Sequence, residues 1–161
     1  MNPFDLSNKV ICVTGASSGI GRQCAVSCSR MGATVVLLAR NEQRLHETLS
    51  IMDNPDKHVI IPVDLTEYAT VELVVKNIVS QVGRISGVLH CAGISTTLPL
   101  KLVTPEKLAE FFQANVFSAY NLTREVCKMG NFSKEGGSIV FFSSVMGKVG
   151  ENGKSLYGMT K

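Results

Sequence analysis

Tyr157 and Lys161 are two residues whose types and spacing could move a proton. They stand four positions apart, so in a helix they would share one face, with Cβ atoms about 5–6 Å apart. A nearby ammonium group favours the phenolate and lowers the pKa of a tyrosine from its free value of about 10. The pair therefore predicts a tyrosine that exchanges protons. Taken alone, the same spacing also fits an ordinary pair on a solvated helix face.

A second chemical feature is a glycine-rich turn between an apolar run and an amphipathic segment. Its glycines, Gly15, Gly19 and Gly21, follow the spacing G-x-x-x-G-x-G. Glycine has no Cβ to hold the backbone away from a phosphate, and the helix that follows offers unpaired N–H groups and the positive end of its dipole. The stretch predicts a strand, a phosphate-binding loop and a helix. A glycine-rich turn without a ligand is the alternative.

Arg40 bears on which dinucleotide such a loop would bind. It stands nineteen positions after Gly21, at the end of the next apolar run. An acid at this place would bond the ribose hydroxyls of NAD, whereas an arginine accommodates the 2′-phosphate of NADP through charge-assisted hydrogen bonds. Arg40 therefore favours NADP over NAD. Glu42 argues for the opposite choice, and Arg40 could also be a plain surface charge.

Apolar runs alternate with amphipathic segments along the whole chain. The runs, which we interpret as strands, are residues 10–14, 34–39, 58–63, 87–91 and 138–142. Helices are expected between them, with Asn41 and Thr104 as N-caps and one helix running from Pro105 to about Met129. In the first helix we expect an inward face made of Ile20, Cys24, Cys28 and Met31.

Continuously apolar strands are typical of a parallel sheet that is covered on both faces. With right-handed crossovers, the pattern predicts a doubly wound α/β fold, a Rossmann three-layer sandwich with strand order 3-2-1-4-5. Pro62 cannot donate to the ladder, so its strand is expected at the edge. We expect residues 1–161 to form a single NAD(P)-binding domain that is incomplete at its carboxyl end, since a complete fold of this type has a sixth strand.

Composition excludes several other classes. The net charge is +3, with basic residues scattered, so we expect no nucleic-acid partner. We find neither a leader-like stretch nor a run of about 20 apolar residues, which predicts a cytoplasmic protein with no membrane contact. Five cysteines without a C-x-x-C pair argue against zinc and against a disulfide framework, and no metal is expected. Cys24 and Cys28 could form a two-ligand clip, but core packing is the simpler interpretation.

From Lys9 to Lys161 the sequence resembles the short-chain dehydrogenase/reductase family, most closely its 3-oxoacyl-[acyl-carrier-protein] reductase-like members. The resemblance rests on separated motifs in the right order. They are Thr14-Gly15-Ala16-Ser17-Ser18-Gly19-Ile20-Gly21, Val63-Asp64-Leu65, His90-Cys91-Ala92-Gly93, Asn115, Ser143-Ser144 and Tyr157-Gly158-Met159-Thr160-Lys161. The resemblance implies an NADP(H)-dependent oxidoreductase that transfers a hydride between the nicotinamide and a small-molecule carbonyl or alcohol. The sequence does not name the substrate.

The resemblance also implies catalytic roles for particular residues. Tyr157 would donate a proton to the carbonyl during reduction, and Lys161 would also bind the nicotinamide ribose. Ser144 would hold the substrate oxygen, with Ser143 as the second choice. Asn115 would kink its helix and support a water relay from the lysine.

The cofactor contacts implied in the same way include Asp64 at the adenine. The full set is Gly15, Ser17, Ser18, Gly19, Ile20, Gly21, Arg40, Asp64, Leu65, Cys91, Ala92, Gly93, Tyr157 and Lys161. One departure is His90-Cys91, where the family commonly has two asparagines. At this place His90 fits a core histidine with a hydrogen-bond partner better than a catalytic base.

Two further expectations depend on what the chain contains. Family members commonly pair through the helix after the fourth strand and the helix that holds the tyrosine, so a homodimer or homotetramer is expected for the full-length form. The alternative to an active enzyme is a catalytically silent dinucleotide-binding fragment that lacks the substrate-binding segment.

Overall fold

A single parallel sheet of five strands organises the computed structural model, which describes residues 4–161. The strands are β1 (Val10–Thr14), β2 (Thr34–Ala39), β3 (Val59–Pro62), β4 (Gly87–His90) and β5 (Ser138–Phe141). Their order is β3-β2-β1-β4-β5, which confirms the predicted Rossmann topology. Thr14 at the end of β1 pairs with Leu38 on one side and His90 on the other. Pro62 lies on an edge strand, as its missing N–H requires.

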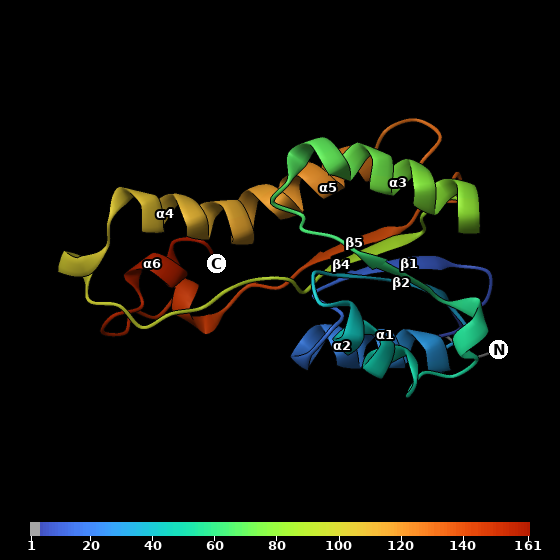
Figure 1. Cartoon of the computed structure of the whole chain (residues 1–161), viewed down its shortest axis with the longest axis horizontal. Coiled ribbons are helices and arrows are strands. Elements are labelled where there is room, and N and C mark those ends of the chain that lie inside the picture. Colours follow the sequence, from blue (N-terminus) through green and yellow to red (C-terminus); the bar gives the residue numbers. More distant parts are fainter. Residues whose placement is uncertain (1–3) are drawn as a thin grey trace.

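Helices cover both faces of the sheet (Figure 1). On one face lie α1 (Gly19–Arg30) and α2 (Glu42–Leu49), and on the other lie α3 (Tyr68–Val82) and α5 (Ser118–Val126). Two more helices, α4 (Pro105–Phe112) and α6 (Ser155–Gly158), lie beyond the ends of β4 and β5 (Figure 1). The chain leaves these strands and runs out beneath α4, so this part of the molecule extends past the sheet.

Alternate residues of the central strands place their side chains in two separate hydrophobic cores. Val36 and Leu38 of β2 point to the side of α3 and α5, whereas Val35 and Leu37 point to the side of α1 and α2. All four side chains are fully buried. A strand with apolar residues on both faces can only be stable between two helical layers, and this requirement sets the three-layer arrangement.

Local capping starts two of the helices as expected. The Oδ1 of Asn41 accepts a hydrogen bond from the N–H of Arg44 at 2.9 Å, and the Oγ1 of Thr104 accepts one from the N–H of Lys107 at 3.2 Å. Each bond satisfies an N–H group that has no partner inside its helix. Pro105 follows Thr104 as the first helical residue.

The predicted inward face of the first helix is confirmed for Cys24 and Cys28 but wrong for Ile20 and Met31. Ile20 is 60% exposed and Met31 is also exposed, while Gly21, Ala25 and Val26 are buried against the sheet. Cys24 and Cys28 are partly buried beside them. Gly21 has no room for a side chain, because a Cβ there would overlap the backbone of Gly15 in the turn after β1.

The long helix predicted from Pro105 to about Met129 is also different in detail. It is divided into α4, a π-helical turn at Gln113–Phe117, and α5, and it ends at Val126. A π-turn inserts an extra residue into the helical ladder and shifts the faces on either side of it. α4 therefore extends over the carboxyl end of the sheet, whereas α5 packs on its face.

The buried leucine of α5 offers a test of this packing. Leu122 is fully buried in the core beneath α3 and α5, whereas Leu73 on α3 is 67% exposed. We expect Leu122→Ala to lower the free energy of unfolding by about 2–5 kcal/mol, through lost burial and the cavity it leaves. Leu73→Ala, the control, should change it by less than about 0.5 kcal/mol. Chemical denaturation measures both, and equal effects would contradict the assigned core.

Candidate active site

The residues predicted to bind a cofactor follow the carboxyl ends of successive strands. Gly15 follows β1, Arg40 follows β2, Asp64 comes two residues after β3 ends, and Cys91 follows β4. All pairings in the sheet are parallel, so these four chain exits lie along one edge. Ligands of doubly wound folds bind outside this edge.

The glycine loop has the shape that a phosphate group needs. Gly19 has φ of +53°, a conformation that side chains disfavour, and a Cβ there would meet nothing within 4 Å. A Cβ on Gly21 would overlap the carbonyl oxygen of Gly15. The glycines thus bring the start of α1 close to the end of β1 while the outer side of the loop stays open.

The first turn of α1 suits an anion. Ser18 is the N-cap residue, but its side chain makes no capping hydrogen bond, and the first turn contains no acid. The N–H groups of this turn are therefore not satisfied by a side chain, and the helix dipole adds positive potential there. Together with the open side of Gly19, the residues present fit the pyrophosphate of a dinucleotide.

The remaining predicted cofactor residues lie on this loop and on the segments after β3 and β4. The Oγ1 of Thr14 accepts a hydrogen bond from the N–H of Ala92 at 3.0 Å, which ties the chain after β4 to the end of β1. Leu65 is buried, Cys91 is partly buried, and Ile20 and Ser17 lie on the loop and the first turn. Sequence reasoning did not identify Thr14 as a supporting residue, although it opens the glycine motif.

Arg40 and Asp64 face each other across the ends of β2 and β3. The Nη1 of Arg40 lies 3.8 Å from the Oδ2 of Asp64, and the Arg40 side chain is 74% exposed. Burial acts to raise the pKa of Asp64, but hydrogen bonds from Thr66 and the charge of Arg40 outweigh it and hold the pKa below its usual value. An exposed guanidinium in so loose an ion pair can turn toward a phosphate.

The predicted catalytic residues lie where the chain passes the ends of β4 and β5. The Nζ of Lys161 donates a hydrogen bond to the carbonyl oxygen of Phe142 at 3.3 Å. The hydroxyl of Ser143 donates to the carbonyl oxygen of Lys161 at 2.9 Å. Ser144 accepts a hydrogen bond from the N–H of Met146 at 3.2 Å through its Oγ. Ser143 and the carbonyl of Phe142 thus hold Lys161, whereas the bond of Ser144 stays within its own turn.

Tyr157 and Lys161 do not share one helix, contrary to the prediction. Tyr157 lies in α6, which ends at Gly158, and the N–H of Lys161 bonds to the carbonyl of Gly158, three residues back. The chain is wound more tightly there than in an α-helix. The lysine is instead positioned by its contacts with the segment after β5.

Asn115 connects three segments of the site from within the π-turn. Its Oδ1 accepts a hydrogen bond from the N–H of Ile94 at 2.7 Å, and its Nδ2 donates to the carbonyl of Ile94 and to the Oγ1 of Thr160. A Cβ on Gly93 would lie 3.1 Å from the Oδ1 of Asn115 and 3.3 Å from the Nζ of Lys161. The asparagine and the lysine therefore meet at Gly93, and Thr160 is a partner that sequence reasoning missed.

Comparison with known proteins identifies the family of the chain. The family model described as short chain dehydrogenase matches residues 9–161. The chain belongs to the short chain dehydrogenase family. The family membership predicted from the motifs is confirmed, whereas the particular likeness to 3-oxoacyl-[acyl-carrier-protein] reductases stays a prediction.

Two curated relatives illustrate the breadth of this family. The chain is 32% identical over 162 residues to the uncharacterized oxidoreductase YciK of Escherichia coli K12, with 97% of the chain and 64% of the relative covered. It is 30% identical over 165 residues to the 3-dehydrosphinganine reductase of Danio rerio, with 99% and 49% covered. The chain thus spans about half to two thirds of the length of these relatives.

Solved structures of family members have the same fold. A short chain dehydrogenase from Shigella flexneri 2a strain 301, complexed with NADP, superposes with a TM-score of 0.86 at 32% identity, covering 96% of this chain and 66% of that one. Another, from Escherichia coli CFT073, gives a TM-score of 0.87 at 32% identity, covering 100% and 72%.

His90, the departure from the common family motif, is a buried structural residue. Its Nε2 lies 2.8 Å from the Oγ1 of Thr123, and its ring stacks on Phe141 with centroids 4.7 Å apart. Burial lowers the pKa of His90 to about 4. A histidine with a partner that stays neutral at physiological pH fits the core interpretation.

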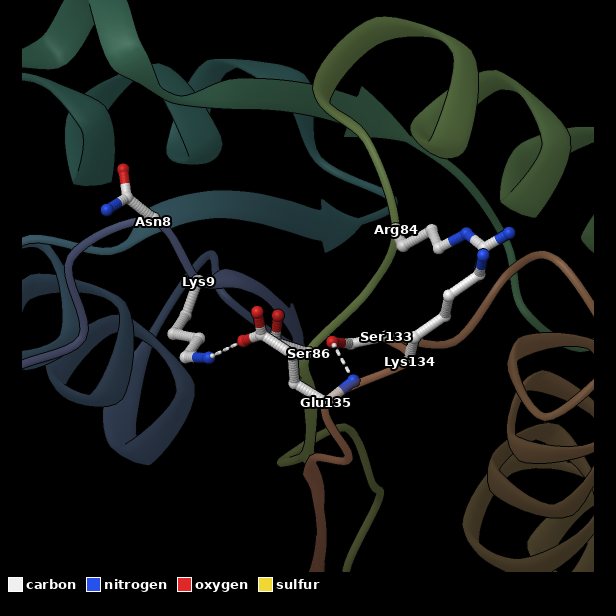
Figure 2. A pocket seen from close by; sticks show the side chains of 7 residues that line it. All are labelled: Asn8, Lys9, Arg84, Ser86, Ser133, Lys134 and Glu135. Carbon is white, nitrogen blue, oxygen red and sulfur yellow. Dashed lines mark hydrogen bonds and ion pairs between the residues drawn. The ribbon is translucent and has the colours of Figure 1, made fainter.

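Two hollows lie away from the glycine loop. One, about 610 Å³, lies between the segment after β4 and the segment before α6. Its lining residues are Thr97, Pro99, Leu100, Glu151, Asn152, Gly153 and Ser155. The other, about 410 Å³, lies at the amino end of the sheet, where the ammonium of Lys9 reaches Glu135 at 2.8 Å (Figure 2). Of these two hollows, the first lies on the carboxyl side of the sheet, the side where ligands of doubly wound folds bind.

Two other classes of feature are absent from residues 4–161. None of the helices there combines the length and the apolar character that crossing a membrane requires. In the same range no group of three or more histidine, cysteine or acidic side chains is arranged to hold a metal ion.

The burial of His90 predicts a dependence of stability on pH. Its pKa is lower in the folded than in the unfolded state, so the unfolded chain binds more protons between about pH 6.5 and pH 4. The contribution of the neutral ring is complete above pH 6.5 and is lost as the pH falls toward 4. His58, whose pKa burial also lowers, acts in the same direction. In His90→Asn, the free energy of unfolding should fall less steeply from pH 7 to pH 5.

Urea denaturation at several pH values measures this slope. His46→Gln is the control, because His46 is largely exposed on α2. An unchanged slope in His90→Asn would mean that the histidine does not carry the effect.

Proposed function

We propose that the protein is an NADP(H)-dependent oxidoreductase that interconverts a carbonyl and an alcohol. The observation that carries the proposal is the meeting of Lys161, Asn115 and Gly93 beside the serine pair, at the edge of the sheet that holds the glycine loop. Membership of the short chain dehydrogenase family supports the same reaction class. Because the chain spans about half to two thirds of its relatives' length, the proposal concerns the intact protein.

The cofactor would lie along the carboxyl edge of the sheet. Gly15, Ser17, Ser18, Gly19, Ile20 and Gly21 would hold the pyrophosphate, with Arg40 at the 2′-phosphate and Asp64 and Leu65 toward the adenine. Cys91, Ala92 and Gly93 would line the path from there to the nicotinamide. When bound, NADP supplies the hydride chemistry. The NADP complex of the Shigella flexneri relative supports NADP over NAD, as does the exposed guanidinium of Arg40.

Tyr157 and Lys161 would carry out the proton transfer. The hydroxyl of Tyr157 donates its proton to the substrate oxygen during reduction and takes it back during oxidation. The ammonium of Lys161 stabilises the phenolate that remains. One of its hydrogens is directed to the carbonyl of Phe142, which leaves others for the cofactor ribose.

Ser144 and Asn115 would orient the reacting groups. The Oγ of Ser144 accepts from the N–H of Met146, so its own hydrogen is available to bond the substrate oxygen. Asn115 holds the backbone at Ile94, which fixes the approach to Gly93 and the lysine. After reduction, a water relay through this segment and Lys161 would bring a proton from solvent to the Tyr157 phenolate, and after oxidation it would carry the proton back to solvent.

The substrate is proposed as a small-molecule ketone or alcohol. The hollow between Thr97 and Ser155 adjoins α6, which bears Tyr157, and is suited to the remainder of such a molecule. The Danio rerio relative is named as a reductase, 3-dehydrosphinganine reductase, which supports the reducing direction. A cytoplasmic location and a homodimeric or homotetrameric assembly stay predictions. The hypothesis of a silent dinucleotide-binding fragment is not favoured by relatives named as oxidoreductases and reductases.

Replacement of the tyrosine tests the chemistry. In the intact protein, Tyr157→Phe should lower kcat for NADPH-linked ketone reduction by at least about 10²-fold, because it removes the proton donor and nothing else. The dissociation constant of NADPH, measured by fluorescence titration, should change little. Tyr120→Phe, at an exposed tyrosine of α5, is the control. Retained turnover in Tyr157→Phe would rule out the proposed mechanism.

Replacement of Arg40 tests the choice of cofactor. Arg40→Ala should weaken NADPH binding by roughly tenfold, through loss of a charge-assisted contact to the 2′-phosphate, and leave NADH binding nearly unchanged. Isothermal titration with both dinucleotides measures the ratio. Arg44→Ala, four residues further on and exposed on α2, controls for a general loss of positive charge. A parallel loss for both cofactors would contradict the assignment.

A further inference from the structure

The proposed cofactor contacts leave one network beneath the glycine loop without a role. Arg22 of α1 and Thr48 of α2 both bond to the backbone of this loop. The Nη2 of Arg22 donates to the carbonyl oxygen of Ser17 at 2.8 Å, and the hydroxyl of Thr48 donates to the carbonyl oxygen of Ala16 at 2.9 Å. Two consecutive carbonyls of the loop are therefore held by side chains from the two neighbouring helices.

The two side chains are also joined to each other. The Nε of Arg22 donates to the Oγ1 of Thr48 at 3.0 Å, and its Nη2 reaches Glu47 at 3.1 Å. Thr48 is fully buried. Its hydroxyl also lies 3.1 Å from the carbonyl oxygen of Arg44, one turn earlier in α2. A hydroxyl has a single hydrogen, and its shorter contact is to Ala16.

The direction of these bonds matters for an anion. A carbonyl oxygen that points toward a phosphate repels it, whereas an N–H group attracts it. Arg22 and Thr48 draw both carbonyls to the side of the loop that faces α2. A Cβ on Gly19 would meet nothing within 4 Å, so the loop is open there, at the first residue of α1, whose N-terminus has no side-chain cap.

We propose that Arg22 and Thr48 are positioning residues of the cofactor site, which hold the glycine loop in the orientation that binds pyrophosphate. The proposal rests on the proposed function, because it assumes that the loop binds a dinucleotide. Neither residue needs to touch the cofactor: both act through the backbone of Ala16 and Ser17. Pyrophosphate is common to NADP and NAD, so the two residues set affinity and Arg40 sets the choice between them.

Thr48→Val separates this role from that of Arg40, because valine keeps the shape and removes the hydroxyl without changing charge. In the intact protein we expect it to weaken NADPH and NADH by the same factor, roughly five- to tenfold for a lost buried hydrogen bond. Thr48→Ser, which keeps the hydroxyl, should restore most of the affinity. Titration calorimetry with each dinucleotide gives the dissociation constants.

Ser29→Ala is a matched control for the loss of a buried hydroxyl. Ser29 lies near the other end of α1, donates to the carbonyl of Val26 and accepts from the N–H of Asp53, which follows α2. Ser29 therefore connects α1 to the segment after α2, at a place away from the glycine loop. Both variants should lower the melting temperature, but only Thr48→Val should weaken dinucleotide binding.

If Thr48→Val does not fold, Arg22→Lys serves instead, since a lysine keeps the charge but lacks the fork that reaches both Ser17 and Thr48. The same parallel loss of affinity is expected. Unchanged binding in a folded variant, or a loss confined to NADPH, would overturn the positioning role while the proposed function stands. If the unaltered protein binds neither dinucleotide, the proposed function fails and this proposal fails with it.

Discussion

Every strand of the sheet runs in the same direction, and the rest of the site depends on this constraint. Parallel strands bring all their carboxyl ends to one edge, so chain segments that are far apart in the sequence leave the sheet side by side. The glycine loop, Arg40, Asp64 and the segment around Gly93 meet there for this reason alone. The crossovers that parallel pairing requires also supply the helices, and the start of α1 becomes the anion-binding end of the loop.

The parallel direction of the strands does not by itself determine the shape of the site, because the loops after the strands could take many conformations. In this chain, buried or partly buried polar side chains bond to loop backbone at several points. Thr14 holds Ala92, Asn115 holds Ile94, and Thr48 holds Ala16. A buried backbone group without a partner costs about 1–3 kcal/mol, so each such bond strongly disfavours alternative loop conformations. The site is thereby organised before any ligand binds, which reduces the entropy that binding must overcome.

Charge is distributed in keeping with this organisation. The first turn of α1 carries no acid, and the guanidinium of Arg40 is exposed at the neighbouring strand end. Arg22, which lies beneath the loop, is paired with Glu47 and occupied by backbone and hydroxyl acceptors. The positive groups at the edge where an anionic dinucleotide would lie are therefore the start of α1 and the guanidinium of Arg40, which stands beside the carboxylate of Asp64. At β4, the neutral ring of His90 adds no charge to this edge.

The sequence by itself determined the class of fold, the strand order and the positions of nearly all strands, because continuous apolar runs and glycine-marked turns are local signals. It also identified the family, because each motif is a short stretch of consecutive residues and the motifs follow one another in the right order. Only the tertiary structure decided which face of α1 packs inward, where the long helix changes to a π-turn, and how Lys161 is held. The tertiary structure also revealed the hydrogen-bond partners of Asn115 and the hydrogen bonds from Arg22 and Thr48 to the backbone of the glycine loop. These features depend on contacts between residues that are distant in the chain, such as Ala16 with Thr48, and no local pattern records which buried hydroxyl will meet which carbonyl.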